Sequence, residues 1–180
     1  MKSLFAAQLI LVALALTAPA HAERPGFSAG VGLNSGLALV GDDSGAVTND
    51  SQEDLQGFTV FGTVEFSPSW GVAVSYRETD GELGSLEMAY NQIAAHAVRR
   101  WRVGTRVRPH VKFGLAHTGM EEIDFFGTRS ESGVGISFGG GMEIGSQRVA
   151  FLLELDSTGV ALGDEVKGIA NWTAGLAVRF

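Results

Sequence analysis

Apolar side chains recur at every second position in eight separate segments of the chain. In one of them, Phe58, Val60, Val64 and Phe66 share one face and alternate with more polar neighbours. Because successive side chains of a β-strand point to opposite faces, this period of two predicts a strand with one apolar face. The apolar faces run through residues 27–39, 58–66, 70–76, 86–98, 107–115, 134–144, 149–155 and 170–180. The pattern therefore predicts an all-β protein with eight strands.

The opposite faces of these strands carry charged side chains together with many small residues. The ionisable residues on them are Glu65, Arg77, Glu87, Arg99, Arg106, Arg108, His110, Lys112, Glu143, Glu154, Asp156 and Arg179. This assignment of faces leaves no Asp, Glu, Lys or Arg on an apolar face. Because an unpaired buried charge is costly, the near balance of acids and bases favours a closed interior in which they pair.

Polar connections of two lengths alternate along the chain. The long ones are residues 41–56, 78–85, 118–131 and 157–167, and the short ones are residues 67–69, 101–105 and 145–148. Transmembrane β-barrels have short turns at one end and longer loops at the other. The sequence therefore predicts an eight-stranded antiparallel up-and-down transmembrane β-barrel. Its bulky apolar faces would meet lipid, and its small and charged faces would fill a narrow lumen.

A lumen of this kind predicts a network of ion pairs, because arginine can form two parallel bonds with one carboxylate. The expected pairs join Glu65, Glu87, Glu143 and Glu154 to Arg77, Arg99, Arg106, Arg108, Lys112 and Arg179. With the interior plugged in this way, we expect no open pore.

The composition excludes several classes of protein. The 180 residues contain no cysteine, so disulfides and cysteine-based metal or redox sites are excluded. The net charge of −7 disfavours nucleic-acid binding, which needs a basic surface. At the N-terminus Lys2, the apolar run 4–18 and the small residues Ala20 and Ala22 follow the pattern of a secretory signal peptide. We expect residues 1–22 to be this peptide and residues 23–180 to form the barrel domain.

The end of the chain carries the most specific motif. A polar residue, a glycine two positions on, and alternating apolar residues lead to a terminal aromatic, as Thr173, Gly175, Val178 and Phe180. In this the chain resembles small outer-membrane β-barrels of the OmpA/OmpX type. The resemblance implies the outer membrane of a Gram-negative bacterium, with both termini at the periplasmic end and the long connections outside. It implies that these four residues are a signal for the barrel-assembly machinery. No C-terminal peptidoglycan-binding domain is expected.

Candidate catalytic groups are few. Gly26, Ser28 and Gly30 match the letters of a nucleophile elbow, but that motif needs a following helix, and here a strand pattern continues. Lipid A-modifying barrels place a histidine near the outer leaflet, where His117 would lie on the apolar face, yet Gly119 stands where such a site would want serine. The face assignment turns His96 toward lipid. We assign His110 to the lumen and expect no catalytic, cofactor or metal site.

The long connections are rich in acids. The first and third contain Asp42, Asp43, Asp50, Glu53, Asp54, Glu121, Glu122 and Asp124. Acids of this kind are typical of a solvated loop, which is the favoured interpretation, and the alternative is that they bridge to lipopolysaccharide phosphates through divalent cations. The sequence favours a structural or surface-interaction role, in membrane integrity, adhesion or contact with a host ligand. Two alternatives stay open: a lipid A-modifying enzyme, and a soluble secreted β-barrel that binds an apolar ligand inside. Outer-membrane lipids and lipopolysaccharide are the expected partners.

Overall fold

The computed structural model describes residues 26–41, 47–83, 86–101, 106–124, 127–162 and 165–180. Within these ranges the side chains of residues 38–41, 47–54, 82–83, 86–87, 122–124, 162 and 165–167 are not described. The expected signal peptide lies outside the described residues. No helix in the described ranges is long and apolar enough to cross a membrane.

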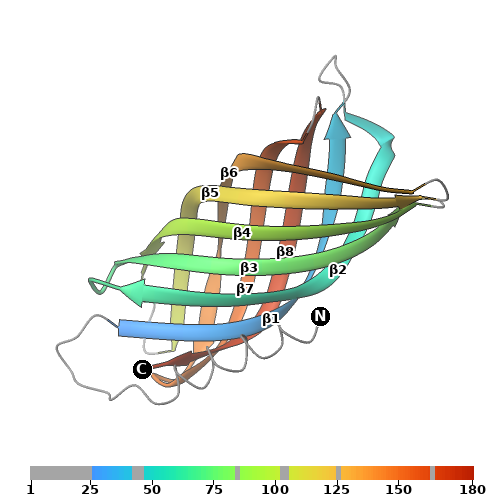
Figure 1. Ribbon diagram of the computed structural model, residues 1–180. Helices are drawn as coiled ribbons and strands as arrows, with labels where there is room; N and C mark the ends of the chain where they lie inside the picture. The colour runs from blue at the N-terminus through green and yellow to red at the C-terminus, as the bar shows by residue number, and fades with distance from the viewer. Residues whose placement is uncertain (1–25, 42–46, 84–85, 102–105, 125–126, 163–164) are drawn as a thin grey trace.

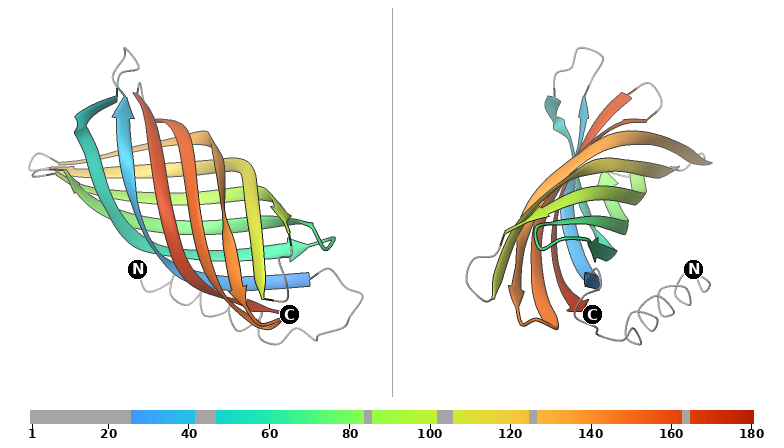
Figure 2. Two further views of the ribbon diagram at one scale, coloured as in Figure 1. Left: turned by 180° about the vertical axis from the view of Figure 1, so that it is seen from behind. Right: turned by 90° about the vertical axis from the view of Figure 1, so that its left-hand side faces the viewer.

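Eight strands form one closed antiparallel barrel in which every strand pairs with its neighbours in sequence (Figure 1). They are β1 (Gly26–Gly41), β2 (Val47–Glu65), β3 (Trp70–Leu83), β4 (Leu86–Arg100), β5 (Val107–Asp124), β6 (Gly127–Gly145), β7 (Val149–Leu162) and β8 (Glu165–Arg179). The predicted fold is confirmed. The polar segments expected as long connections are largely strand instead, because residues 47–56, 78–83, 118–124, 127–131, 157–162 and 165–167 extend the strands at that end of the barrel. The name long connections is kept for these segments. The strands of one wall cross those of the opposite wall at a wide angle, as the two views of Figure 2 show, which is the strong tilt that a closed barrel requires.

The barrel closes where the first and last strands meet. β1 and β8 pair from Ser28 opposite Arg179 to Gly41 opposite Val166. At the end of this seam the amide of Phe180 donates to the Phe27 carbonyl oxygen over 2.8 Å, and the two rings lie 5.8 Å apart. No strand edge is therefore left unpaired at the seam, as the lipid phase demands.

The apolar side chains point outward. Leu33, Val134 and Trp172 are 76%, 65% and 66% exposed, whereas inward residues such as Thr118 are buried. This arrangement overturns the alternative of a soluble barrel with an apolar interior. Small inward side chains let neighbouring strands approach closely. A Cβ added to the inward Gly114 of β5 would collide with the Ala95 carbonyl oxygen of β4.

The face assignment is correct for seven strands and wrong for β4. In β4 the even-numbered residues, which carry the larger apolar side chains, point into the lumen, and the odd-numbered ones point outward. Met88 and Tyr90 pack inside the lumen at the end with the long connections, while Ala95 and Ala97 lie on the outer wall. Both faces of β4 are largely uncharged, so alternation alone does not fix its phase. Because the side-chain period is two, choosing the other phase moves every residue to the opposite face.

Candidate functional site

The end of the lumen near the short turns holds five charged side chains. Glu65 accepts a hydrogen bond from Arg108 over 3.4 Å and lies 3.7 Å from Arg100. Arg100 also donates to Glu143 over 3.4 Å, and Arg179 pairs with the other oxygen of Glu143. These residues come from β2, β4, β5, β6 and β8, so the ion pairs tie together strands that are not all neighbours.

A second group of charges fills the middle of the lumen. His110 and Lys112 of β5 both contact Glu154 of β7, with 3.0 Å between His110 Nε2 and Glu154 Oε2. Lys112 Nζ also lies 3.3 Å from Asp156. Arg77 of β3 makes two bonds to the same Asp156, of 2.6 and 2.9 Å. Each carboxylate is thus shared by two positive or ring-nitrogen groups, which compensates for its removal from water.

A chain of neutral hydrogen bonds continues from Arg77 to the far wall. Arg77 donates to Gln92 over 3.2 Å, and Gln92 donates to Thr158 over 3.3 Å. The Thr158 hydroxyl donates to Ser137 over 3.0 Å, and His96 Nε2 lies 3.0 Å from the same Ser137 oxygen. These side chains are buried, so each polar group is satisfied by a neighbour instead of by bulk water.

Apolar side chains occupy the lumen beyond the polar network. The cluster, here called the apolar cap, consists of Leu55, Met88, Tyr90, Met120, Val160 and Ile169, all at most 5% exposed. Tyr90 and Met120 are cross-strand partners one step beyond the pair Gln92 and Thr118. A cavity of about 30 Å³ lies between the two charged groups, where His96, Lys112, Glu143 and Glu154 are among its lining residues, and such a volume suits about one water molecule.

Seven of the ten residues expected to form the lumen network lie in these ion pairs. They are Glu65, Arg77, Arg108, Lys112, Glu143, Glu154 and Arg179. Arg99 is a correction, because the phase of β4 places it on the outer wall and Arg100 in the lumen. Arg106 lies exposed before β5 and has no ion pair to any described residue. The side chain of Glu87 lies outside the described residues.

Two members of the network were not assigned a partner from the sequence. Asp156 stands two positions after Glu154, so strand periodicity already placed both on one face, and this signal could have identified it. Arg100 could have been found only by fixing the phase of β4. The expectation that His96 meets lipid is wrong for the same reason, since it is 3% exposed inside the barrel.

The remaining candidates from the sequence do not converge on a reacting centre. His117 is exposed on the outer wall opposite Ile93 and Val134 of the neighbouring strands. Ser28 is buried within β1 and is followed by strand, not by the helix that a nucleophile elbow requires. Among the described side chains, no group of three or more His, Asp or Glu could hold a metal ion.

The outer wall has two different borders. At the end with the long connections, the apolar band gives way to outward polar side chains, among them Ser35, Gln56, Asn91, His117 and Ser132. At the end with the short turns, it finishes with the indoles of Trp70 and Trp101 on either side of Arg99. The Arg99 guanidinium carbon lies 4.8 Å and 6.0 Å from the two ring centres. Aromatic side chains of this kind mark the interface of a bilayer.

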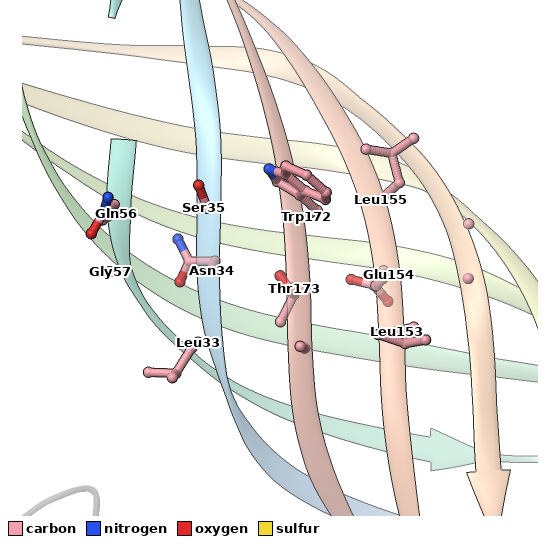
Figure 3. A pocket seen from close by; sticks show the side chains of 13 residues that line it. Leu33, Asn34, Ser35, Gln56, Gly57, Leu153, Glu154, Leu155, Trp172 and Thr173 are labelled. Carbon is pink, nitrogen blue, oxygen red and sulfur yellow. The ribbon is translucent and has the colours of Figure 1, made fainter. Parts of the chain in front are cut away.

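A groove of about 720 Å³ opens on the outer wall across β6, β7, β8, β1 and β2 (Figure 3). The outward side chains Leu33, Leu153, Leu155 and Trp172 line it, and all four are exposed. The inward residues Asn34, Glu154 and Thr173 line it as well, so the groove runs along the apolar surface and also borders the polar interior.

The C-terminal motif lies in β8 and just after it. Thr173 is buried and inward, whereas Val178 and Phe180 are half-buried at the turn end of the barrel. A Cβ added to Gly175 would press on the backbone of Gly32 in β1. This glycine therefore allows β8 to approach β1 closely.

Solved structures with the same fold are outer-membrane barrels. Neisserial surface protein A aligns with a TM-score of 0.73 at 12% identity, over 86% of this chain and 97% of its own. Ail, the attachment invasion locus protein of Yersinia pestis, aligns with a TM-score of 0.61 at 19% identity, over 87% and 99%. OprG from Pseudomonas aeruginosa aligns with a TM-score of 0.59 at 12% identity, over 87% and 96%. At these identities the likeness shows the fold.

Sequence comparison gives the family. Among curated proteins none matches the chain in sequence. The family model described as outer membrane protein beta-barrel domain matches residues 7–180. Together with the closed eight-stranded barrel and its outward apolar band, this match places the protein in the outer membrane of a Gram-negative bacterium. The chain belongs to the outer membrane protein beta-barrel domain family.

Proposed function

We propose that the protein is a non-enzymatic surface protein with a closed lumen, and that its long connections face the outside of the cell. The observation that carries this proposal is the set of ion pairs across the lumen, in which Arg77 and Asp156 join opposite walls. If the lumen conducts no solute, two surfaces remain for function. The long connections can contact partners, and the outer wall contacts lipids.

Two features support a closed lumen. An ion passing the middle of the barrel would have to displace pairs such as Lys112 with Asp156, and separating paired charges in a closed interior is costly. Beyond them the six side chains of the apolar cap contain a single oxygen, the Tyr90 hydroxyl, which is too little to replace the hydration of an ion.

Conductance in planar bilayers tests the closed lumen. We expect no steady steps from the wild-type protein. The double variant Arg77→Ala with Asp156→Ala removes both partners at once, so it leaves no lone charge where that pair stood. Only when Tyr90→Ala also opens the apolar cap do we expect steady steps. The variant Thr128→Ala, at an exposed position of β6, is the control. Large steady conductance from the wild type would contradict the proposal.

Surface contact is supported by strands that continue beyond the apolar band. In β6 the side chains of Thr128, Arg129, Ser130 and Ser132 are exposed and polar, in line with a segment that projects into water. Ail, which shares the fold, has been crystallised with a heparin analogue. The present chain carries a net charge of −7 and acid-rich long connections. We therefore propose a basic partner surface, or one bridged by divalent cations, and not a bare polyanion.

Binding to immobilised polylysine and heparin distinguishes these partners. Protein in nanodiscs should bind polylysine, with an affinity that falls as salt is added, and should bind heparin weakly without calcium. Glu121→Gln and Glu131→Gln should weaken the polylysine contact, while Arg129→Gln should strengthen it slightly. Equal binding to heparin and polylysine in the absence of calcium would exclude the proposed charge preference.

The proposal also includes partners of the outer wall and of the C-terminal motif. Lipids and lipopolysaccharide would cover the apolar band, and the barrel-assembly machinery would recognise Thr173, Gly175, Val178 and Phe180. Phe180→Ala should reduce the amount of heat-modifiable protein in the outer membrane. Phe27→Ala removes the same ring contact from the other side. A similar loss in both variants would mean that the ring pair acts in stability alone.

A further inference from the structure

Arg99 is a charged residue on an otherwise apolar surface. It is the cross-strand partner of Trp70 in β3 and of Val111 in β5. Its guanidinium lies over the Trp70 ring at 4.8 Å and beside the Trp101 ring at 6.0 Å. Both indoles are themselves exposed on the outer wall, at 42% and 44%. The three side chains form one continuous patch at the end of the apolar band, here called the Arg99 patch.

The charge of Arg99 has no counterion among the described residues. No described carboxylate lies within ion-pair distance of it, and its buried Nε has no hydrogen-bond partner. The nearest acids along the chain at this end, Glu65 and Glu143, point into the lumen and are held by Arg100, Arg108 and Arg179. The indoles attract the cation through their faces but accept no hydrogen bond in the plane of the guanidinium. The terminal N–H groups of Arg99 therefore have no acceptor among the described residues, which leaves them available to an acceptor outside the protein.

The position of the patch defines what that acceptor can be. Outward Val72, Ala97 and Val111 adjoin it on the apolar side, and the short turn at Ser67–Ser69 adjoins it on the other. A guanidinium at this level sits where the hydrocarbon ends and the headgroups begin. The group there that matches a planar, two-pronged donor is a phosphodiester.

We propose that the Arg99 patch binds the phosphodiester of a phospholipid in the periplasmic leaflet. Arg99 would donate to two phosphate oxygens, and the indoles of Trp70 and Trp101 would pack against the glycerol and the first acyl carbons. The assignment of the leaflet rests on the orientation proposed above. The patch thereby fixes the depth of the barrel in the bilayer at one end.

The three tryptophans of the chain make a direct binding measurement possible. In a Trp172→Phe background, the remaining indoles are Trp70 and Trp101, so the fluorescence reports on the patch alone. The protein in a nonionic detergent is titrated with dihexanoylphosphatidylglycerol, with dihexanoylglycerol, which lacks the phosphate, and with inorganic phosphate. We expect saturable emission changes with the phospholipid and none with the other two at equal concentration. Saturation by inorganic phosphate alone would overturn the lipid assignment and leave a simple anion site.

Substitutions of arginine at the same end complete the test. Arg99→Gln should weaken phospholipid binding at least about tenfold. Arg99→Lys keeps the charge but loses the planar, two-pronged guanidinium, so its affinity should lie between those of Arg99→Gln and the wild type. Arg148→Gln is the matched control, because Arg148 is exposed near the same rim but stacks on neither indole. Heat-modifiable migration shows that each variant is folded. Equal affinity of Arg99→Gln and wild type overturns the proposal.

The binding measurement in detergent does not depend on which way the barrel faces. Orientation is tested separately by a cysteine at Ser146, in the turn between β6 and β7, since the chain has no cysteine of its own. A membrane-impermeant maleimide should fail to label it in intact cells and should label it once the outer membrane is opened. Labelling in intact cells would overturn the assignment to the periplasmic leaflet while leaving the binding site standing.

Discussion

Arg77 of β3 and Asp156 of β7 lie 79 positions apart in the chain and are joined by two hydrogen bonds of 2.6 and 2.9 Å across the lumen. Both side chains are almost fully buried, and Asp156 also receives Lys112. The pair thus connects two walls that share no backbone hydrogen bonds.

Removing one partner of this pair should be costly. We expect Asp156→Ala to lower the free energy of unfolding by about 3–5 kcal/mol, because Arg77 would be left buried without its carboxylate. Unfolding in urea, followed in lipid vesicles by heat-modifiable migration on gels, measures the change. Glu131→Ala is the control. Its partner Arg129 is 74% exposed, so the loss should stay below about 1 kcal/mol. Equal losses in the two variants would contradict a structural role of the cross-lumen pair.

Glycines on the two sides of the wall should respond differently to a methyl group. Gly114 faces inward, where a Cβ would collide with the Ala95 carbonyl oxygen, whereas a Cβ on Gly159 meets no atom within 4 Å. We expect Gly114→Ala to destabilise the barrel by about 1–3 kcal/mol, as overpacking does. Gly159→Ala should be close to neutral. The same urea titration compares them, and a neutral Gly114→Ala would show that β4 and β5 can separate without cost.

The depth of the outer wall in the bilayer can be measured along β6. Phe138 lies in the middle of the outward apolar residues of this strand, and Ser132 lies beyond their end. Phe138→Arg should cost about 2–4 kcal/mol and Ser132→Arg only about 0–1 kcal/mol, because the penalty for arginine falls toward the interface. Unfolding in vesicles gives both values. A large penalty at Ser132 would move the border of the hydrocarbon beyond it.

The phase of β4 is open to a chemical test, because the natural chain contains no cysteine. Ala95 faces outward, and Ala94 is 2% exposed in the lumen. A fluorophore attached to Ala95→Cys should be quenched by brominated lipid chains, and Ala94→Cys should resist labelling. Ala97→Cys, two positions further along the outer face, should behave as Ala95→Cys does. Quenching at position 94 instead would restore the phase expected from the sequence.

Much of this architecture can be read from the sequence because a membrane barrel repeats one simple rule. Segments such as 134–144 separate bulky apolar residues from small and charged ones so cleanly that strand, face and environment follow together. Glu154 and Lys112 could be assigned to the lumen by parity alone. Their pairing could be anticipated because an unpaired charge in a closed interior is energetically costly.

The failures have a physical origin in β4. Its inward residues Met88 and Tyr90 belong to the apolar cap, so the inward face of β4 is as apolar as its outward face and the contrast between the two faces is lost. The adjacent Arg99 and Arg100 do not decide the phase of β4, since one of the two must face outward in either phase. Only the tertiary contacts, with Glu143 on one side and Trp70 on the other, separate them.

Because β1 pairs with β8, the barrel can close only after every other strand of the domain is present. Ser28 meets Arg179, so closure joins residues from the two ends of the domain and must wait until the last strand is available. Up to that moment an incomplete sheet exposes two rows of unpaired amides and carbonyls, which favour pairing with other chains. A sheet that inserts before it closes would expose these edges to lipid, so we expect closure to accompany insertion. Closing the barrel also costs the loop-closure entropy of the whole domain.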